Sequence, residues 1–230
     1  MNIGHIKALA LRTKAGSPPR QVACADAIEA RGLLGDAHAG RLSPRQLLLA
    51  GEGVYRDFAL PMHALRENLL LDAETAGLAS GSVLRIGSDV LLRLMFQCEA
   101  CGKLDACRPA LSRDIGLRRG VLARVLRGGV IRPGDAVRDE GLLLPAWSDD
   151  WRARVIQVLD AVPPGSVIEY RDLARLAGIA STYCRGFPRM IARLGRAYAN
   201  KAVPAQSALP YPRWRGDGLF DHPPLEVPGL

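Results

Sequence analysis

Short apolar runs separated by glycine, proline or charge fill residues 1–138, and this pattern restricts the possible folds more than any other feature. The clearest runs span residues 3–11, 46–50, 83–86 and 90–96. The segment 130–137 contains an apolar piece, a turn at Pro133-Gly134 and a second apolar piece, which predicts two strands joined by a tight turn. Many short strands with frequent glycine favour a closed or nearly closed β-barrel, and we expect its flanking helices at 57–68 and 113–120.

The pattern becomes helical after a boundary that we place at 139–147. Asp149 can cap a helix in which apolar residues recur at helical spacing, namely Val155, Val158, Leu159 and Val162. An extended piece at 167–168 leads into a second helix over 170–177, and Pro188 suits the first turn of a third helix that runs to about 198. Three short helices with tight turns predict a small helix-turn-helix or winged-helix module.

The predicted fold class is therefore α+β, with a β-barrel domain at 1–140, a small helical domain at 147–220 and a C-terminal tail at 221–230. A content of 48% hydrophobic and 23% charged residues is typical of a soluble globular protein. No run approaches the ~18 consecutive apolar residues of a membrane span, and we find no export signal. Five cysteines at irregular spacing argue against a secreted disulfide framework, so we expect a cytoplasmic protein. The formal charge of +8 is spread over both halves and permits a polyanionic partner without requiring one.

Two thiols three residues apart, Cys98 and Cys101, precede Lys103. A thiol must lose its proton to act as a nucleophile or a soft-metal ligand, and nearby positive charge favours that loss. The same spacing also occurs in structural zinc sites and in redox pairs. A zinc site would need further ligands, and only Cys107 follows at short range. A reactive cysteine is the favoured interpretation, and a zinc staple through these three cysteines is an alternative.

Residues 32–41 contain three glycines among Asp, His and Arg side chains. Glycine permits tight turns that bring backbone N–H groups close to an anion. Arg41 and Arg45 would complete a phosphate site through bidentate contacts. A plain glycine-rich loop is equally consistent with the spacing, and a lone histidine such as His38 is more often structural than a ligand.

These motifs together closely resemble the MOSC domain, the C-terminal domain of molybdenum cofactor sulfurases, and especially its stand-alone bacterial members. The resemblance spans roughly residues 1–138 and rests on ordered motifs at 32–41, 45–46, 65–69, 81–87, 98–104, 119–125 and 128–135. It implies a β-barrel whose pocket holds the phosphorylated pterin of molybdenum cofactor. It also implies a cysteine that ligates molybdenum or carries a persulfide, and both kinds of chemistry suit a soft, deprotonated sulfur.

Cys101 matches the conserved cysteine of the family best, so the resemblance implies it as catalytic residue and metal ligand. Cys98 and Lys103 are the other catalytic candidates, and Cys98 is additional to the simplest family pattern. The polar positions that we carry over as cofactor-pocket candidates are Asp36, His38, Arg41, Arg45, Arg66 and Asn68. The sequence shows no aminotransferase-like sulfurase, so pyridoxal phosphate, a reductase or a cysteine desulfurase would belong to a separate partner.

The second half, at about 151–220, resembles the DNA-binding domain of DNA alkyltransferases and alkyltransferase-like proteins. Residues 163–174 follow that family's Pro-x-Gly-x-Val-x-x-Tyr-x-x-Leu-Ala pattern. Where the family has its Pro-Cys-His-Arg acceptor motif, this chain has Val-Pro-Ala-Gln-Ser at 203–207. Alanine cannot accept an alkyl group and the activating histidine is missing, so we do not expect an alkyltransferase.

The same resemblance implies a surface for nucleic acid. The expected contact residues are Tyr170, Arg185, Arg189 and Arg193. With Arg196, the arginines recur at spacings that would line one helical face. Tyr183 and Trp214 are further candidates for base stacking. A solvated cationic helix face and ordinary core aromatics are the alternatives.

The leading functional prediction is a molybdenum-cofactor-dependent reductase or sulfur transferase that works through Cys101, with modified nucleobases recognised by the C-terminal module. The alternative is a non-catalytic protein that binds damaged or modified DNA, with the barrel as a scaffold. We expect no membrane partner, and the sequence leaves the oligomeric state open.

Overall fold

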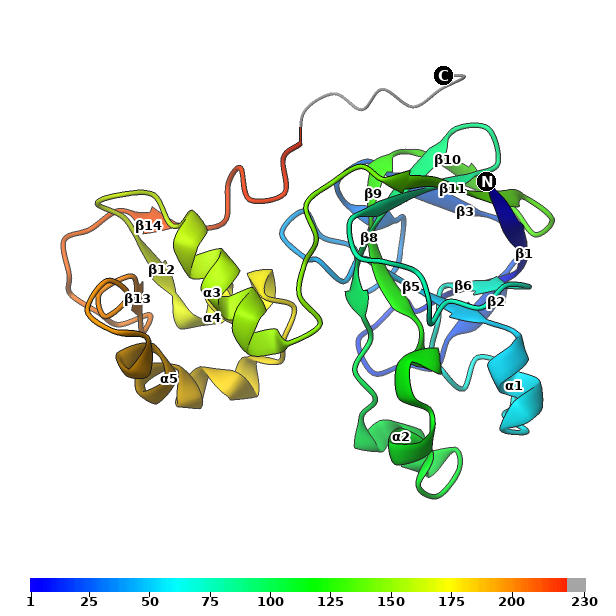
Figure 1. The fold of residues 1–230 in the computed structure, drawn as a ribbon, viewed down its shortest axis with the longest axis horizontal. Helices are drawn as coiled ribbons and strands as arrows, with labels where there is room; N and C mark the ends of the chain where they lie inside the picture. Colours follow the sequence, from blue (N-terminus) through cyan, green and yellow to red (C-terminus); the bar gives the residue numbers. More distant parts are fainter. Residues whose placement is uncertain (223–230) are drawn as a thin grey trace. The chain divides into compact units, whose positions relative to one another are not determined.

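The computed structural model describes residues 1–222, which divide into two compact units, Met1–Trp147 and the residues from Ser148 onward (Figure 1). Of the tail expected at 221–230, residues 223–230 lie outside the described part. No helix within residues 1–222 is both long enough and apolar enough to cross a membrane.

The main sheet of the first unit closes into a β-barrel. In the order β11-β7-β8-β9-β5-β6-β1 each strand pairs with the next, and β11 pairs with β1 to complete the ring, while β2 extends the sheet beside β1. The strands are β1 Asn2–Leu11, β2 Arg20–Val22, β5 Leu47–Gly51, β6 Leu69–Leu71, β7 Ser82–Ile86, β8 Val90–Gln97, β9 Val121–Arg127 and β11 Ala136–Leu142. The α+β class and the closed barrel expected from the short apolar runs are confirmed.

Branched aliphatic side chains fill the barrel interior. The interior cluster includes Ile6, Leu49, Leu84, Leu92 and Val121, which are at most 1% exposed. Strand β8 is buried along its whole length, so both of its faces are covered. Burying one such side chain contributes about 1.5–3 kcal/mol, and the packed interior therefore fixes the strand ends firmly in space.

A smaller sheet of the first unit carries the glycine-rich segment. Its strands, in the order β10-β3-β4, are β10 Gly129–Ile131, β3 Ala25–Ile28 and β4 Gly32–Leu33. The chain leaves β4 and turns through residues 34–41, which we call the glycine loop. Gln46 fastens this loop, because its Nε2 donates hydrogen bonds to the carbonyl oxygens of Ala30 at 2.6 Å and Gly40 at 3.0 Å.

The helical segments of the first unit are shorter than expected. They are α1 Gly53–Asp57, α2 Leu111–Asp114 and two 3₁₀ helices, η1 Gly102–Ala106 and η2 Gly116–Arg119. The helix expected at 57–68 is wrong. α1 ends at Asp57, Ala59 and His63 adopt φ values of 50° and 60°, and Pro61 has no N–H to donate. The helix expected at 113–120 is interrupted at Gly116, whose φ of 55° separates α2 from η2.

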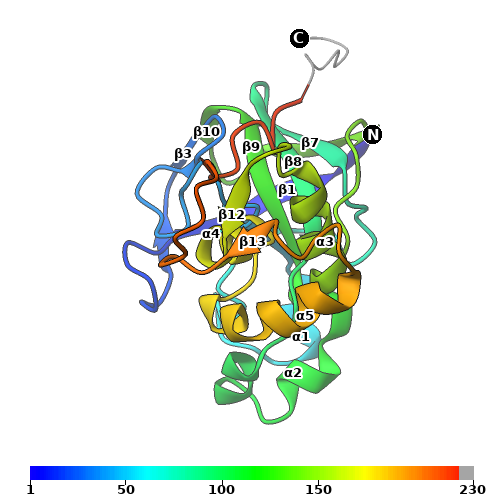
Figure 2. The same cartoon turned by 90° about the vertical axis from the view of Figure 1, so that its left-hand side faces the viewer.

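The second unit combines three helices with a small parallel sheet. The helices are α3 Trp151–Ala161, α4 Tyr170–Leu176 and α5 Phe187–Leu194, with the 3₁₀ helix η3 Ser181–Gly186 before α5. Strand β12 Val167–Glu169 pairs in parallel with β13 Ala202–Val203 and β14 Arg213–Trp214, and Figure 2 shows β12 next to β13. The assignment of this unit as a winged-helix or alkyltransferase-like module stays a prediction.

Helix α3 buries the apolar positions that its spacing predicts, among them Val155, Val158 and Leu159. Its N-cap is Asp150, whose carboxylate accepts a hydrogen bond from the N–H of Arg152 at 3.0 Å, in place of the expected Asp149. Arg154 is also fully buried, and its guanidinium donates to the carbonyl oxygen of Ala177 at 2.8 Å. This hydrogen bond from the buried guanidinium links helix α3 to the end of α4.

Candidate functional site

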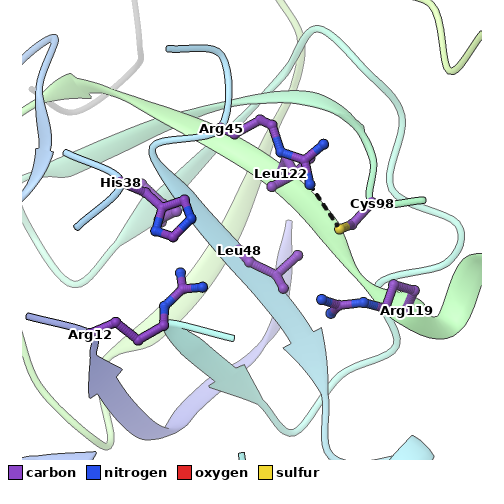
Figure 3. Close-up of a pocket in the computed structure, with 8 residues that line it drawn as sticks. Arg12, His38, Arg45, Leu48, Cys98, Arg119 and Leu122 are labelled. Atoms are coloured by element: carbon purple, nitrogen blue, oxygen red, sulfur yellow. Dashed lines mark hydrogen bonds between the residues drawn. The ribbon is translucent and has the colours of Figure 1, made fainter. Parts of the chain in front are cut away.

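A small cavity of about 50 Å³ lies where several barrel strands begin or end (Figure 3). Its lining residues are Arg12, His38, Arg45, Leu47, Leu48, Cys98, Arg119 and Leu122. Arg12 directly follows β1, Cys98 directly follows β8, and Arg119 is the last residue of η2. The closed barrel therefore brings together side chains that lie far apart in the sequence.

Cys98 presents its sulfur to this cavity from a rigid position. The residue is 5% exposed, and its N–H donates to the carbonyl oxygen of Gly120 at 2.7 Å. Gly120 has a φ of 109°, and a Cβ there would overlap the carbonyl oxygen of Leu49, so only glycine allows this close approach. The Nη2 of Arg45 lies 3.7 Å from the Cys98 sulfur and donates to it. A guanidinium at this distance stabilises negative charge that develops on sulfur.

Two further arginines face the cavity with unused hydrogen-bond donors. Arg119 is 7% exposed, and its Nε and Nη1 are buried with no hydrogen-bond partner among residues 1–222. The Nη2 of Arg12 donates to the Asn68 Oδ1 at 3.3 Å. Its Nε makes no hydrogen bond in the same part of the chain but lies 3.9 Å from the Asp36 carboxylate, within ion-pair distance. Figure 3 shows the Arg12 and Arg119 guanidinium groups on opposite sides of Leu48. Since buried polar groups are nearly always paired, these donors indicate a site for an anionic ligand.

Asp36 does not line the cavity, but its carboxylate positions two residues that do, Arg12 and His38. Its carboxylate accepts hydrogen bonds from the backbone N–H groups of Arg12 at 2.9 Å and His38 at 2.8 Å, and from the Asn68 Nδ2 at 2.9 Å. Burial by itself would raise the pKa of Asp36, but bonds from the His38 side chain and from the two backbone groups lower it to about 2. Asp36 is therefore a charged anchor, and it holds His38 with its Nδ1 at 3.3 Å.

Of the remaining pocket candidates, Arg41, Arg66 and Asn68 do not line this cavity. Asn68 is buried, and its side chain also bonds the backbone of Ala10 and Leu48, so it ties strands together. Arg66 donates to the carbonyl oxygen of Ser17 at 2.7 Å. Arg41 lines a separate hollow of about 350 Å³ on the glycine loop. The structure thus brings together His38 and Arg45 with Cys98.

Cys101 and Lys103 lie outside the lining of the cavity. Cys101 is exposed at the N-terminal end of η1, where Lys103 is also exposed. Cys107 is exposed as well. Within residues 1–222 no group of three or more His, Cys, Asp or Glu side chains is placed to hold a metal ion. Of the two neighbouring thiols, it is therefore Cys98 that shares a cavity with cationic side chains.

Sequence reasoning missed Arg12 and Arg119 as site residues. Arg12 directly follows the first apolar run, and Arg119 belongs to a motif that carries the MOSC resemblance. Each position therefore gives only a weak indication of a site residue. No neighbouring residue in the sequence distinguishes either arginine as a ligand contact. Their convergence depends on barrel closure, which a single sequence does not specify residue by residue.

In the second unit, the four arginines at 185–196 do not share one helix. Helix α5 covers only Phe187–Leu194, so Arg189 and Arg193 lie on it while Arg185 belongs to η3. Gly195, with a φ of 100°, ends α5. Those three arginines are exposed.

Tyr170 has a mainly structural environment. Its ring lies 5.8 Å from that of Phe187, and burial raises the pKa of its hydroxyl. Tyr183, in contrast, is 40% exposed and packs edge-on against Trp151, with ring centroids 4.9 Å apart. Beside α4 lies a polar hollow of about 250 Å³ lined by Glu169, Arg171, Asp172, Arg175 and Arg215.

Comparison with known proteins agrees with the barrel. Residues 42–138 match the family model of the MOSC domain, which supports a MOSC domain over this part of the first unit. The YuaD protein from Bacillus subtilis has a similar structure, with 19% sequence identity, a TM-score of 0.50, and coverage of 60% of this chain and 94% of that chain. A second solved structure, described as a hypothetical protein, has 17% identity and a TM-score of 0.52, and covers 87% of this chain and 96% of that chain.

YiiM from Escherichia coli is also similar, with 15% identity and a TM-score of 0.48 over 86% of this chain and 99% of that chain. At such identities the likeness to YuaD and to the second structure shows the fold alone. A search of curated proteins finds no match.

Proposed function

We propose that the first unit carries sulfur as a persulfide on Cys98. The observation that supports this is a buried thiol 3.7 Å from the Arg45 guanidinium, in a cavity where the Arg119 guanidinium has unused donors. A persulfide extends the side chain by one sulfur atom, and its terminal sulfur is negatively charged when deprotonated. Arginine donors that face the cavity stabilise that charge, and the low exposure of Cys98 limits side reactions with solvent oxidants.

Molybdenum cofactor, with which MOSC domains are associated, fits this site in charge but not in size. The arginines and His38 suit an anionic group, and a thiolate is a soft ligand for a metal. A ligand as large as a phosphorylated pterin, however, needs a pocket of about 300–1,000 Å³, and the cavity beside Cys98 measures about 50 Å³. We therefore favour persulfide chemistry at this cysteine, and we derive no step through the cofactor.

The test is to locate sulfane sulfur on the protein. The purified protein is exposed to inorganic polysulfide, alkylated and fragmented, and the position of the extra sulfur is read by mass spectrometry. We expect the extra sulfur on Cys98, its loss in Cys98→Ser, and its retention in the control Cys24→Ser, which changes an exposed thiol. Extra sulfur on Cys101 with none on Cys98 would overturn the proposal in favour of the cysteine that the family resemblance implies.

As a second function, we propose that the second unit binds nucleic acid. Support comes from exposed arginines on two elements, Arg189 and Arg193 on α5 and Arg171 and Arg175 on α4. Each phosphate contact that is lost should lower the slope of log affinity against log salt by about 0.7–0.9. Filter binding with duplexes with and without alkylated guanine, using R189A and R193A, tests this. Unchanged binding and salt slope in both variants would contradict a role for α5.

A further inference from the structure

We infer that the cavity beside Cys98 binds a thio-oxyanion, of which thiosulfate is the simplest, and that this anion is the sulfur donor to Cys98. The inference rests on the proposed persulfide function and adds the chemical class of the donor. Three observations carry it: the size of the cavity, the excess of cationic donors that face it, and the position of the thiol.

The size of the cavity selects a small donor. One buried water needs about 10–15 Å³ by the same measure, so about 50 Å³ has room for roughly three to five water-sized groups. A tetrahedral anion with five heavy atoms is of this size. The side chains of Leu47, Leu48 and Leu122 complete the lining and leave no space for a peptide or a nucleotide.

The charges around the cavity select an oxyanion. Arg12, Arg45, Arg119 and His38 supply the polar lining, and no acidic side chain is among the lining residues in the described chain. Planar guanidinium groups match the oxygen geometry of sulfonate and phosphate groups, and Arg119 has both an Nε and an Nη1 unpaired. A dianion would satisfy these donors, while apolar leucine side chains on the same walls strengthen the attraction.

The position of the thiol makes sulfur transfer possible within this complex. The Cys98 thiolate attacks the outer sulfur of thiosulfate, a sulfur–sulfur bond forms, and the bond between the outer and the central sulfur breaks. The bonding electron pair leaves with the central sulfur, so sulfite departs as a dianion and the persulfide anion remains on Cys98. Atoms and charge balance, and no oxidant or reductant is consumed. Arg45 lies beside the reacting sulfur, and the Nε and Nη1 of Arg119 have no hydrogen-bond partner among residues 1–222 and are assigned to the sulfonate oxygens.

The experiment compares two sulfur donors on the intact protein. Thiosulfate should release one sulfite per protein molecule in a single turnover and place the extra sulfur on Cys98, and phosphate should compete. Arg119→Met should slow sulfite release by roughly 10- to 100-fold, because a hydrogen bond to a charged group is lost. Loading by inorganic polysulfide, which has no sulfonate oxygens for Arg119 to bind, should slow by a clearly smaller factor. Arg119→Lys should keep part of the thiosulfate rate, and the melting temperature of each variant checks that it is folded.

The outcomes separate the inference from the function on which it rests. Polysulfide loading of Cys98 without sulfite release from thiosulfate would overturn the inference and leave the persulfide function standing. Failure of both donors would overturn both. An equal effect of Arg119→Met on the two donors would contradict the assignment of this arginine to the sulfonate oxygens.

Discussion

Replacing Arg119 by methionine should make the ligand-free protein more stable. Arg119 is 7% exposed, and two of its donors have no hydrogen-bond partner within the described residues. One buried unsatisfied polar group costs about 1–3 kcal/mol, and methionine fills similar space without needing a partner. We therefore expect the free energy of unfolding of Arg119→Met to rise by about 1–3 kcal/mol in buffer free of oxyanions.

Urea unfolding followed by circular dichroism measures this change, and Arg124→Met is the matched control. Arg124 is equally buried at 4% exposure, but its Nη1 donates to the carbonyl oxygens of Arg41 at 3.0 Å and Ser43 at 2.6 Å. Removing a satisfied arginine leaves those carbonyl groups unpaired, so the control should lose about 1–3 kcal/mol. The two substitutions therefore have opposite expected signs although the chemistry of the change is the same.

Adding an oxyanion should stabilise the wild-type protein more than the Arg119→Met variant. At a concentration one hundred times its Kd, thiosulfate or phosphate should stabilise the wild-type protein by about 2.7 kcal/mol, and Arg119→Met should gain much less. An Arg119→Met protein that is less stable than wild type by more than about 1 kcal/mol, with the anion effect intact, would refute the argument that this guanidinium awaits a ligand.

Three other substitutions test the structure that supports the site. Asp36 has a pKa of about 2 against an ordinary 3.8, so the stability that it contributes is present above pH 3.8 and is lost as the pH falls through about 2. Asp36→Asn should therefore lower the free energy of unfolding by about 2 kcal/mol at pH 7 and by little at pH 2. Urea unfolding at both pH values measures this difference. Gly120→Ala should cost more than Gly134→Ala in thermal melts, because both glycines have positive φ but only Gly120 has a backbone oxygen in the way. Tyr55→Phe removes a hydrogen bond to the buried side chain of Glu67 and should lower the free energy of unfolding by about 1–3 kcal/mol, and an unchanged value would contradict a stabilising role of this bond.

The barrel was predictable because its strands have a strong local signal. The runs at 3–11, 46–50, 83–86 and 90–96 coincide with β1, β5, β7 and β8 to within two residues. The expected helix at 57–68 failed because Ala59, His63 and Arg66 adopt positive φ values, which the spacing of apolar residues does not reveal. In the second unit, β13 and β14 have two residues each, too short for any periodic pattern to show them.

The site was predictable as a region but not as a set of atoms. The motif at 98–104 contains Cys98, which lines the cavity together with His38 of the glycine loop, but the spacing of the motif did not distinguish the two cysteines. The structure distinguishes them through the chain path: Cys98 is still hydrogen-bonded to Gly120 beside the barrel, whereas Cys101 already caps η1 and is exposed. A difference of three residues at a strand end thus decides which sulfur faces the cavity.

A cavity lined by three arginines needs compensating negative charge. The position of the carboxylates that supply this charge matters for function. The structure places Asp36 and Glu67 outside the lining. Asn68 and two backbone N–H groups donate to Asp36, whose carboxylate also lies 3.9 Å from the Arg12 Nε, and the Tyr55 hydroxyl donates to Glu67. The His63 Nδ1 lies 2.7 Å from the Glu67 carboxylate as well. These carboxylates offset repulsion among the arginines, yet they leave the Arg119 donors and the Arg12 Nε without a hydrogen bond. Fixed donors that face a cavity need no reorganisation when an anion enters, and this preorganisation is what a site for sulfur transfer from an oxyanion requires.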